Sequence, residues 1–293
     1  MQASDTTAVP ATATTREEPP ELRYFDAGGV GTVQSLCDLW NFRGLAWTLA
    51  VRDVRVQYRQ SLLGISWALA RPFLTMLVFI WLFGMIGRVP ADRPSDYGLL
   101  LFAGLLPWQW FTSCVSVGSN SLVANEHLIT KVFFPRWILV LSPLLVAGLD
   151  FILGLLLLAG MMVWKGHPVG LECLLAPLFV LLAAVSAIAM TSWLAAMNAL
   201  YRDVRHVVPF ALQLGMLVSP VVYQSDTILS ARVQTIASIN PMATAINGFR
   251  YCLLGTPAPA GIEIIISVIS CLLLLLSGVW FFGKVESTIA DRV

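Results

Sequence analysis

The chain alternates between long apolar stretches and short polar segments. Six stretches have the length that a helix needs to cross a bilayer, about 20 predominantly apolar residues. They lie approximately at 65–86, 97–122, 137–164, 173–200, 207–223 and 264–282. The fifth is the shortest and contains Pro209 and Pro220, which cannot donate a backbone hydrogen bond within a helix. The pattern predicts six transmembrane helices.

The segment 35–59, ahead of the first stretch, has a different pattern. Leucine, valine and tryptophan recur at helical spacing, among them Trp40 and Trp47, while arginines and aspartates occupy other directions. Such an amphipathic helix is typical of a segment that lies in the membrane interface. A soluble helix packed on a partner is the alternative interpretation.

Residues 1–34 differ from the rest of the chain. The part up to Pro20 is rich in Thr, Ala and Pro, and it lacks the apolar centre of about 7–15 residues that a signal peptide requires. Too little apolar surface is available here to form a packed core. We therefore predict a disordered cytoplasmic tail at 1–34 and a transmembrane domain at 35–293.

The segment 224–263 between the fifth and sixth stretches is too apolar for a plain tether. Asn240-Pro241 divides it and predicts two short, re-entrant-like helices. If both termini lie on one side, that side holds 13 of the 18 Lys and Arg residues and the other side holds five. The positive-inside rule then predicts cytoplasmic termini and an external 224–263 segment.

The composition strengthens the membrane interpretation. Hydrophobic residues make up 57% of the chain and charged residues 12%, against about 25% charged in soluble globular proteins. The mean hydropathy is +0.78. We therefore expect an all-α polytopic membrane protein. The net charge of +1 offers no basic tail for nucleic acid, and the scattered cysteines and histidines predict neither a disulfide framework nor a metal site.

Signatures of catalysis are missing from the sequence. It contains no G-x-x-x-x-G-K-[ST], H-E-x-x-H or G-x-S-x-G motif. Asp150 is the only acidic residue deep inside a predicted span, whereas enzymes and ion-coupled carriers usually place several there. We interpret Asp150 as a structural hydrogen-bonding group, with Asn198 as a candidate partner; a functional role is the alternative. The sequence favours a protein that is not an enzyme.

Aromatic residues gather in the middle of the second span and in the first. Sugar rings have apolar C–H faces that aromatic rings can contact without fixed hydrogen bonds, which suits a sliding polymer. Packing or lipid contact is the alternative for each ring. The candidate channel residues are Trp81, Phe83, Trp108, Trp110, Phe111 and Tyr223.

Two loops on the predicted cytoplasmic side, 125–136 and 201–205, are short, charged and amphipathic. That pattern is typical of elements docked on a cytoplasmic partner, with membrane anchoring as the alternative. The candidate docking residues are Glu126, His127, Lys131, Arg136, Arg202 and Asp203.

Ordered motifs along the chain then point to a family. They are R-D-V-R-V-Q-Y-R-Q-S-L-L-G at 52–64 followed by Trp67-Ala68, G-L-L-P-W at 104–108, L-I-T-K-V-F-F-P-R at 128–136, Y-R-D-V at 201–204, S-P-V-V-Y at 219–223, N-P-M at 240–242 and G-F-R at 248–250. This series resembles the permease subunits of polysaccharide ABC exporters. These form the type-2 ABC permease family, which moves lipid-linked O-antigen, teichoic acid and capsule.

The resemblance implies an assembly and a location. It implies a homodimer in the bacterial cytoplasmic (inner) membrane, with a channel at the dimer interface and two copies of a separate ATPase subunit that binds ATP and Mg²⁺. This chain itself would hold no cofactor. The loops 125–136 and 201–205 would contact the ATPase, and the 224–263 segment would gate the channel exit. Arginines near the interfacial helix would attract the anionic head group of a lipid-linked polysaccharide such as O-antigen: Arg52, Arg55, Arg59 and Arg71.

Two other functions stay open from the sequence. One is an ABC permease that exports a drug or a small lipid and needs no continuous aromatic channel. The other is a polytopic membrane glycosyltransferase or acyltransferase, which would need a cluster of catalytic acids or histidines. A neighbouring ATPase gene flanked by glycosyltransferase genes would separate the three functions.

Overall fold

The computed structural model describes residues 42–59, 66–86, 96–129, 131, 134–168 and 170–292, without the side chains of residues 86, 227 and 286–292. All of them belong to the unit Gly31–Val293. The predicted tail at 1–34, the start of the interfacial helix, and Arg88 and Arg93 in the first external loop lie outside the described residues.

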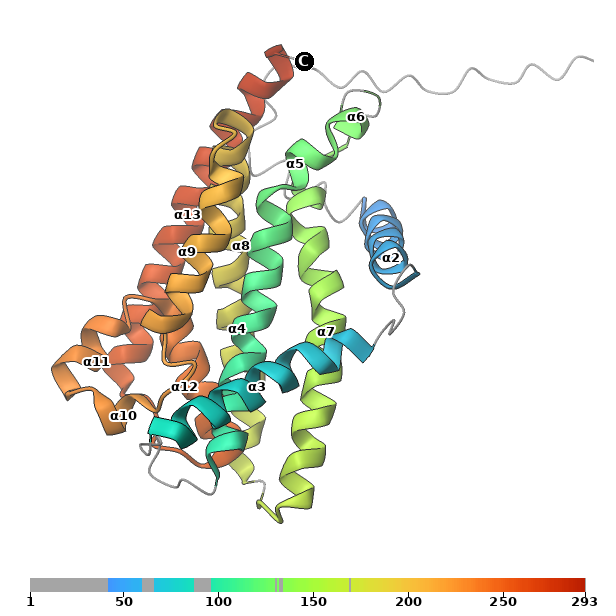
Figure 1. Ribbon diagram of the computed structural model, residues 1–293. Helices are drawn as coiled ribbons and strands as arrows, with labels where there is room; N and C mark the ends of the chain where they lie inside the picture. Colours follow the sequence, from blue (N-terminus) through green and yellow to red (C-terminus); the bar gives the residue numbers. More distant parts are fainter. Residues whose placement is uncertain are drawn as a thin grey trace, which may run out of the picture. The chain divides into compact units, whose positions relative to one another are not determined.

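Helices account for nearly all of the described residues, and no strand occurs among them (Figure 1). This confirms the all-α fold. The elements are α2 (Arg43–Arg59), α3 (Ser66–Ile86), α4 (Tyr97–Ser119), α5 (Ser121–Ala124), α6 (Glu126–Ile129), α7 (Trp137–Trp164), the 3₁₀ turn η2 (Leu171–Leu175), α8 (Ala176–Leu200), α9 (Val204–Val218), α10 (Ser225–Ile228), α11 (Ala231–Ala237), α12 (Pro241–Leu254) and α13 (Gly261–Arg292).

Five segments of the described chain are long and apolar enough to cross a membrane: Ser66–Met85, Tyr97–Ser119, Trp137–Trp164, Leu171–Leu200 and Gly261–Val285. They match five of the six predicted spans. The other predicted span, 207–223, corresponds to α9, which has 15 residues and ends at Val218. At 1.5 Å per residue α9 is about 22 Å long, below the ~30 Å of a bilayer core. The number of spans therefore stays a prediction.

The helix α4 forms the centre of the bundle. It contacts α3, α7, α8, α9 and α12. Of its most apolar 18-residue stretch 72% is buried, against 11% of the corresponding stretch of α3. The helix α3 contacts α4 and α7 on one side only and crosses them obliquely in Figure 1. Its other side presents large apolar residues to the outside, including Trp81, which is 65% exposed.

The two predicted docking loops lie at the same end of the bundle. There α5, the start of α7 and the ends of α8 and α13 meet in an apolar cluster around Leu122, Trp137, Ala195 and Phe282. The helix α6, the turn before α9 and the C-terminal end of α13 lie at this end, which we call the docking end (Figure 1). The α7–α8 connection and α10–α12 lie away from it, as the predicted alternation of loops requires.

A buried arginine connects α12 to the rest of the bundle. Arg250 is 1% exposed. Its Nε donates to the carbonyl of Leu100 on α4 at 2.9 Å. Its two terminal nitrogens donate to the carbonyls of Pro220, Val221 and Tyr223 at 2.6–2.9 Å. Arg250 therefore holds the turn after α9 against α4, in an arrangement that we call the arginine clamp.

Candidate functional site

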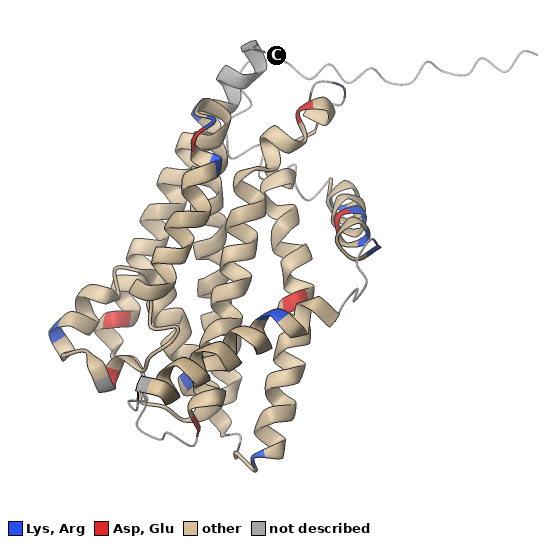
Figure 2. Cartoon of the chain, viewed as in Figure 1, with Lys and Arg blue, Asp and Glu red and all other residues tan. Residues whose placement is uncertain are grey.

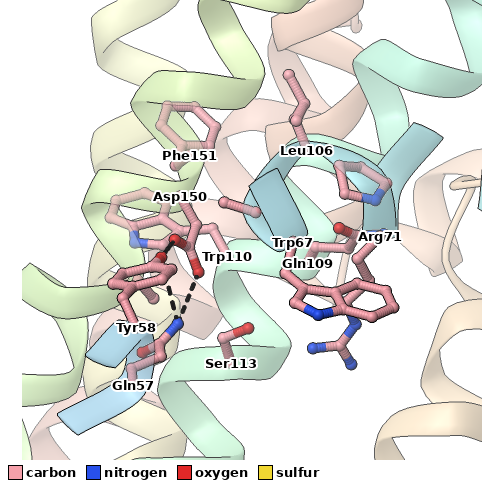
Figure 3. A pocket seen from close by; sticks show the side chains of 13 residues that line it. Gln57, Tyr58, Trp67, Arg71, Leu106, Gln109, Trp110, Ser113, Asp150 and Phe151 are labelled. Atoms are coloured by element: carbon pink, nitrogen blue, oxygen red, sulfur yellow. Dashed lines mark hydrogen bonds between the residues drawn. The ribbon is translucent and has the colours of Figure 1, made fainter. Parts of the chain in front are cut away.

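A polar cavity lies between α2, α3, α4, α7 and α9, in a bundle whose helices carry few charges elsewhere (Figure 2). Its volume is about 770 Å³. A side pocket of about 140 Å³ shares part of its lining (Figure 3). The polar lining residues of the main cavity are Asp53, Gln57, Arg71, Thr75, Gln109, Thr112, Ser113, Ser116, Asp150 and Gln213. Polar side chains on membrane helices typically face a functional cavity, so this is the candidate site.

The helix α4 supplies one wall of the polar cavity. Gln109 and Ser113 are four residues apart, as are Thr112 and Ser116, so all four lie on one face of the helix. The Thr112 hydroxyl donates to the carbonyl of Trp108 in the preceding turn. A largely uncharged helix thereby presents a row of amide and hydroxyl groups to the cavity. This row was not among the residues predicted from the sequence, whose candidates were charged or aromatic; the four-residue spacing was the available signal.

The opposite wall is formed by α2 and α7. Asp150, in the middle of α7, accepts hydrogen bonds from the Tyr58 hydroxyl and from Gln57 Nε2, the latter at 3.3 Å (Figure 3). Burial, together with the hydrogen bond to Asp150, raises the pKa of the Tyr58 phenol. Tyr58 therefore keeps its proton at neutral pH and can donate it in this contact.

The predicted partner of Asp150 was wrong. Asn198 Nδ2 donates to the carbonyl of Ser119 at 2.9 Å and to Asn120 Oδ1 at 3.3 Å. Asn198 lies near the end of α8, level with the end of α4, whereas Asp150 lies in the middle of α7. The two residues are therefore at different depths in the bundle.

The three rings predicted on α4 have different surroundings. Trp108 lines the polar cavity and is 5% exposed. Its ring packs on Phe111, with 5.4 Å between the ring centroids. Trp110 lines the side pocket, stacks on Phe151 at 5.0 Å and donates from Nε1 to the carbonyl of Leu144 at 3.3 Å. Phe111 is 6% exposed and packs in the core, away from both linings.

The other predicted channel aromatics lie outside the polar cavity. Trp81 is on the exposed side of α3, and Phe83 meets Tyr97 edge-on at 5.9 Å. Tyr223 follows α9, where its hydroxyl donates to the carbonyl of Val218 at 3.1 Å. The channel role of all six aromatics stays a prediction.

The four predicted head-group arginines fall into two places. Arg52, Arg55 and Arg59 line a groove of about 530 Å³ along the outward face of α2, which we call the arginine groove. Arg52 also pairs with Asp53 at 2.8 Å, and it donates to Asn125 Oδ1 at 3.4 Å. Arg71 is separate from them, on α3, and lines the polar cavity and the side pocket.

The predicted docking residues lie together at the docking end. Most of them are exposed: Glu126 and His127 on α6, Lys131 beyond it, and Arg202 and Asp203 in the turn before α9. Arg136, directly ahead of α7, is half-buried. Among the described residues, no group of three or more His, Cys, Asp or Glu side chains could hold a metal ion.

Comparison with known proteins identifies the family of the region that contains the polar cavity. The ABC-2 type transporter family matches residues 44–254, a range that contains every residue lining the polar cavity. The O-antigen export system permease protein RfbA of Myxococcus xanthus is 31% identical over 214 residues, which are 73% of this chain and 81% of that protein. A protein of the same name from Klebsiella pneumoniae is 28% identical over 200 residues, 68% of this chain and 76% of that protein.

Proposed function

Because the chain belongs to the ABC-2 type transporter family, we propose that it is the transmembrane permease subunit of an ABC exporter of lipid-linked polysaccharide, with O-antigen as the first candidate substrate. The observation that carries the proposal is the similarity to two O-antigen export permeases over most of their length. The polar cavity within the matched region supports it. The permease makes and breaks no covalent bond and provides the pathway.

The lining of the polar cavity suits a sugar better than an apolar drug or lipid. Amide and hydroxyl groups such as those of Gln109, Ser113 and Gln213 can each donate and accept hydrogen bonds, as sugar hydroxyls do. Trp108 and, in the side pocket, Trp67 and Trp110 add aromatic surface beside them.

The arginine groove suits an anionic head group at the membrane surface. Its three arginines line the groove together with the apolar side chains of Trp47 and Val56. Arginine binds phosphate oxygens through paired hydrogen bonds. A lipid pyrophosphate would be attracted there while its glycan reaches the polar cavity.

The rest of the assembly follows from the family. The chain would form a homodimer that carries two ATPase subunits on its docking ends, and ATP and Mg²⁺ would bind in those subunits. The two docking loops and the C-terminal part of α13 lie together at the docking end, which supports a cytoplasmic C-terminus in the bacterial inner membrane. ATP-driven closure of the ATPase pair would then push on α6 and on the turn before α9.

The test is a strain that lacks this gene, complemented with the intact chain. Surface polysaccharide should be lost on deletion, lipid-linked glycan should accumulate inside the cell, and complementation should restore export. A partner ATPase unable to hydrolyse ATP serves as the control and should reproduce the deletion. Unchanged surface polysaccharide in the deleted strain would contradict the proposal.

A further inference from the structure

Asp150 occupies an unusual position for a membrane carboxylate. It is half-buried in the middle of α7, it lines both the polar cavity and the side pocket, and both of its hydrogen-bond donors are side chains of α2. A carboxylate that served only as a structural hydrogen-bond acceptor would be better enclosed by the protein. Asp150 instead faces open space on one side and two exchangeable partners on the other.

The two donors present a pattern that a sugar ring can copy. The Tyr58 hydroxyl reaches Oδ1 and Gln57 Nε2 reaches Oδ2, so each carboxylate oxygen accepts one hydrogen from a neighbouring donor (Figure 3). Two adjacent hydroxyls of a sugar ring offer the same pair of donors. A hydrogen bond from a hydroxyl to an ionised carboxylate is also stronger than one between neutral groups.

The surroundings of Asp150 offer further groups that suit a sugar. Gln109 and Ser113 on α4 line the same side pocket and can meet further hydroxyls. Trp67 on α3 lines it too and is 50% exposed, which leaves ring surface free to contact an apolar sugar face.

The balance of charge favours a neutral ring at this point. The charged residues that line the polar cavity are Asp53 from α2, Arg71 from α3 and Asp150 from α7, while α4 and α9 contribute no charged residue. Asp53 is paired with Arg52 at 2.8 Å, so Asp150 and Arg71 together leave no net positive charge in the cavity to attract a pyrophosphate. The anionic head group would therefore stay near the arginine groove, and the neutral sugars would enter the cavity.

We propose that Asp150 binds neutral sugar units of the transported polymer, and that two ring hydroxyls replace Tyr58 and Gln57 on its carboxylate. This inference rests on the proposed function and adds a site to it. Sugar binding then frees the end of α2 that carries Gln57 and Tyr58. The other end stays attached, because Leu49 and Ala50 are buried against α7 and Ser142 donates to Asp53 at 3.2 Å.

Competition between α2 and the sugar gives the inference a distinctive test. The intact complex with its ATPase is reconstituted in vesicles, and ATP turnover is measured against lipid-linked glycan extracted from the deletion strain. Asp150→Asn should raise the KM for this glycan about tenfold. Tyr58→Phe removes a competing donor and should lower the KM about threefold. Ser142→Ala cuts the other hydrogen bond between α2 and α7, and as the matched control it should leave the KM unchanged.

A second probe separates the sugar from the head group. The same lipid pyrophosphate without its glycan should show equal affinity for the wild type and for Asp150→Asn. If Tyr58→Phe raises the KM as Asp150→Asn does, the contact between α2 and α7 is structural and the inference is overturned. An unchanged KM in Asp150→Asn overturns it as well, while the wild type still exports. A wild type that neither exports nor responds to the glycan overturns the proposed function itself.

Discussion

Arg250 and Asp150 are two ionisable residues of this bundle that are held in opposite ways. Arg250 in the arginine clamp is 1% exposed, and its side-chain hydrogen bonds all go to backbone carbonyls, from α4 and from the turn after α9. Asp150 is half-buried beside the polar cavity, and its hydrogen bonds come from two side chains of α2.

The two residues differ in how easily they can exchange their hydrogen-bond partners. Carbonyls are fixed by the path of the backbone, so the partners of Arg250 can leave only if helices or turns move. Side chains rotate within their rotamers, so Tyr58 and Gln57 can leave Asp150 while α2 and α7 keep their backbone structure. A buried charge with backbone partners therefore indicates a structural role, and one with side-chain partners beside a cavity indicates a site that a ligand can take over.

The strongest test of this comparison is removal of the clamp. Arg250→Ala leaves several buried carbonyls without donors and should destabilise the folded chain by about 3–5 kcal/mol, since each such group costs about 1–3 kcal/mol. The melting temperature in detergent and the yield of folded protein are the measurements. Arg250→Lys, which keeps the charge and three donors, should recover part of the loss. A wild-type melting temperature in Arg250→Ala would show that the clamp contributes nothing.

A smaller effect is expected from crowding the clamp. A Cβ at Gly104 would overlap Arg250 Nη2 and lie 2.7 Å from the carbonyl oxygen of Val221, so Gly104→Ala should cost about 1–3 kcal/mol. Gly160→Ala is the matched control, because nothing lies within 4 Å of a Cβ there, and it should be neutral or slightly stabilising. Equal melting temperatures for the two variants would contradict the expected close packing.

A still smaller effect is expected where α2 meets α7. Ser142→Ala removes one hydrogen bond to Asp53 and should lower stability by about 0.5–1.5 kcal/mol, the usual net value of such a bond. Thermal unfolding of the detergent-solubilised chain is the measurement. A loss of stability as large as that of Arg250→Ala would mean that this attachment of α2 contributes as much to stability as the arginine clamp.

The smallest change in stability is expected inside the polar cavity. Gln109 lines the cavity and the side pocket, so Gln109→Leu should alter stability by no more than about 0.5 kcal/mol while export falls clearly. Surface polysaccharide and melting temperature are measured on the same preparations. Export that falls only in proportion to folded protein would assign Gln109 to packing instead.

Much of the fold follows from local patterns in the sequence. The predicted spans at 65–86 and 137–164 agree with α3 and α7 within a residue, because apolar periodicity and flanking polar residues act locally. Asn240-Pro241 predicted a helix boundary, and α12 begins at Pro241 with Asn240 Oδ1 accepting from the backbone N–H of Met242.

The site depends on contacts that no local pattern contains. Gln57 and Asp150 are 93 residues apart in the chain, and nothing around either of them specifies the other. Arg250 illustrates the same limit: it was counted as a loop charge for the positive-inside rule, yet it is enclosed by α4 and the turn after α9. The apolar pattern of 207–223 also continued past Val218, where α9 ends and Pro220 follows in the turn.

The shortness of α9 has a consequence for backbone solvation. If α9 enters the bilayer from the docking end, its length of about 22 Å leaves the next turn within the ~30 Å hydrocarbon core, where lipid offers no hydrogen bonds to free carbonyls. In water these groups would bind solvent; here Arg250 donates to the carbonyls of residues 220, 221 and 223, and Tyr97 donates to that of Val222 at 2.9 Å. The side chains of Arg250 and Tyr97 thus take the place of solvent as hydrogen-bond donors to this irregular backbone segment. The carbonyls of residues 220–223 in the turn after α9 therefore all have donors within the protein.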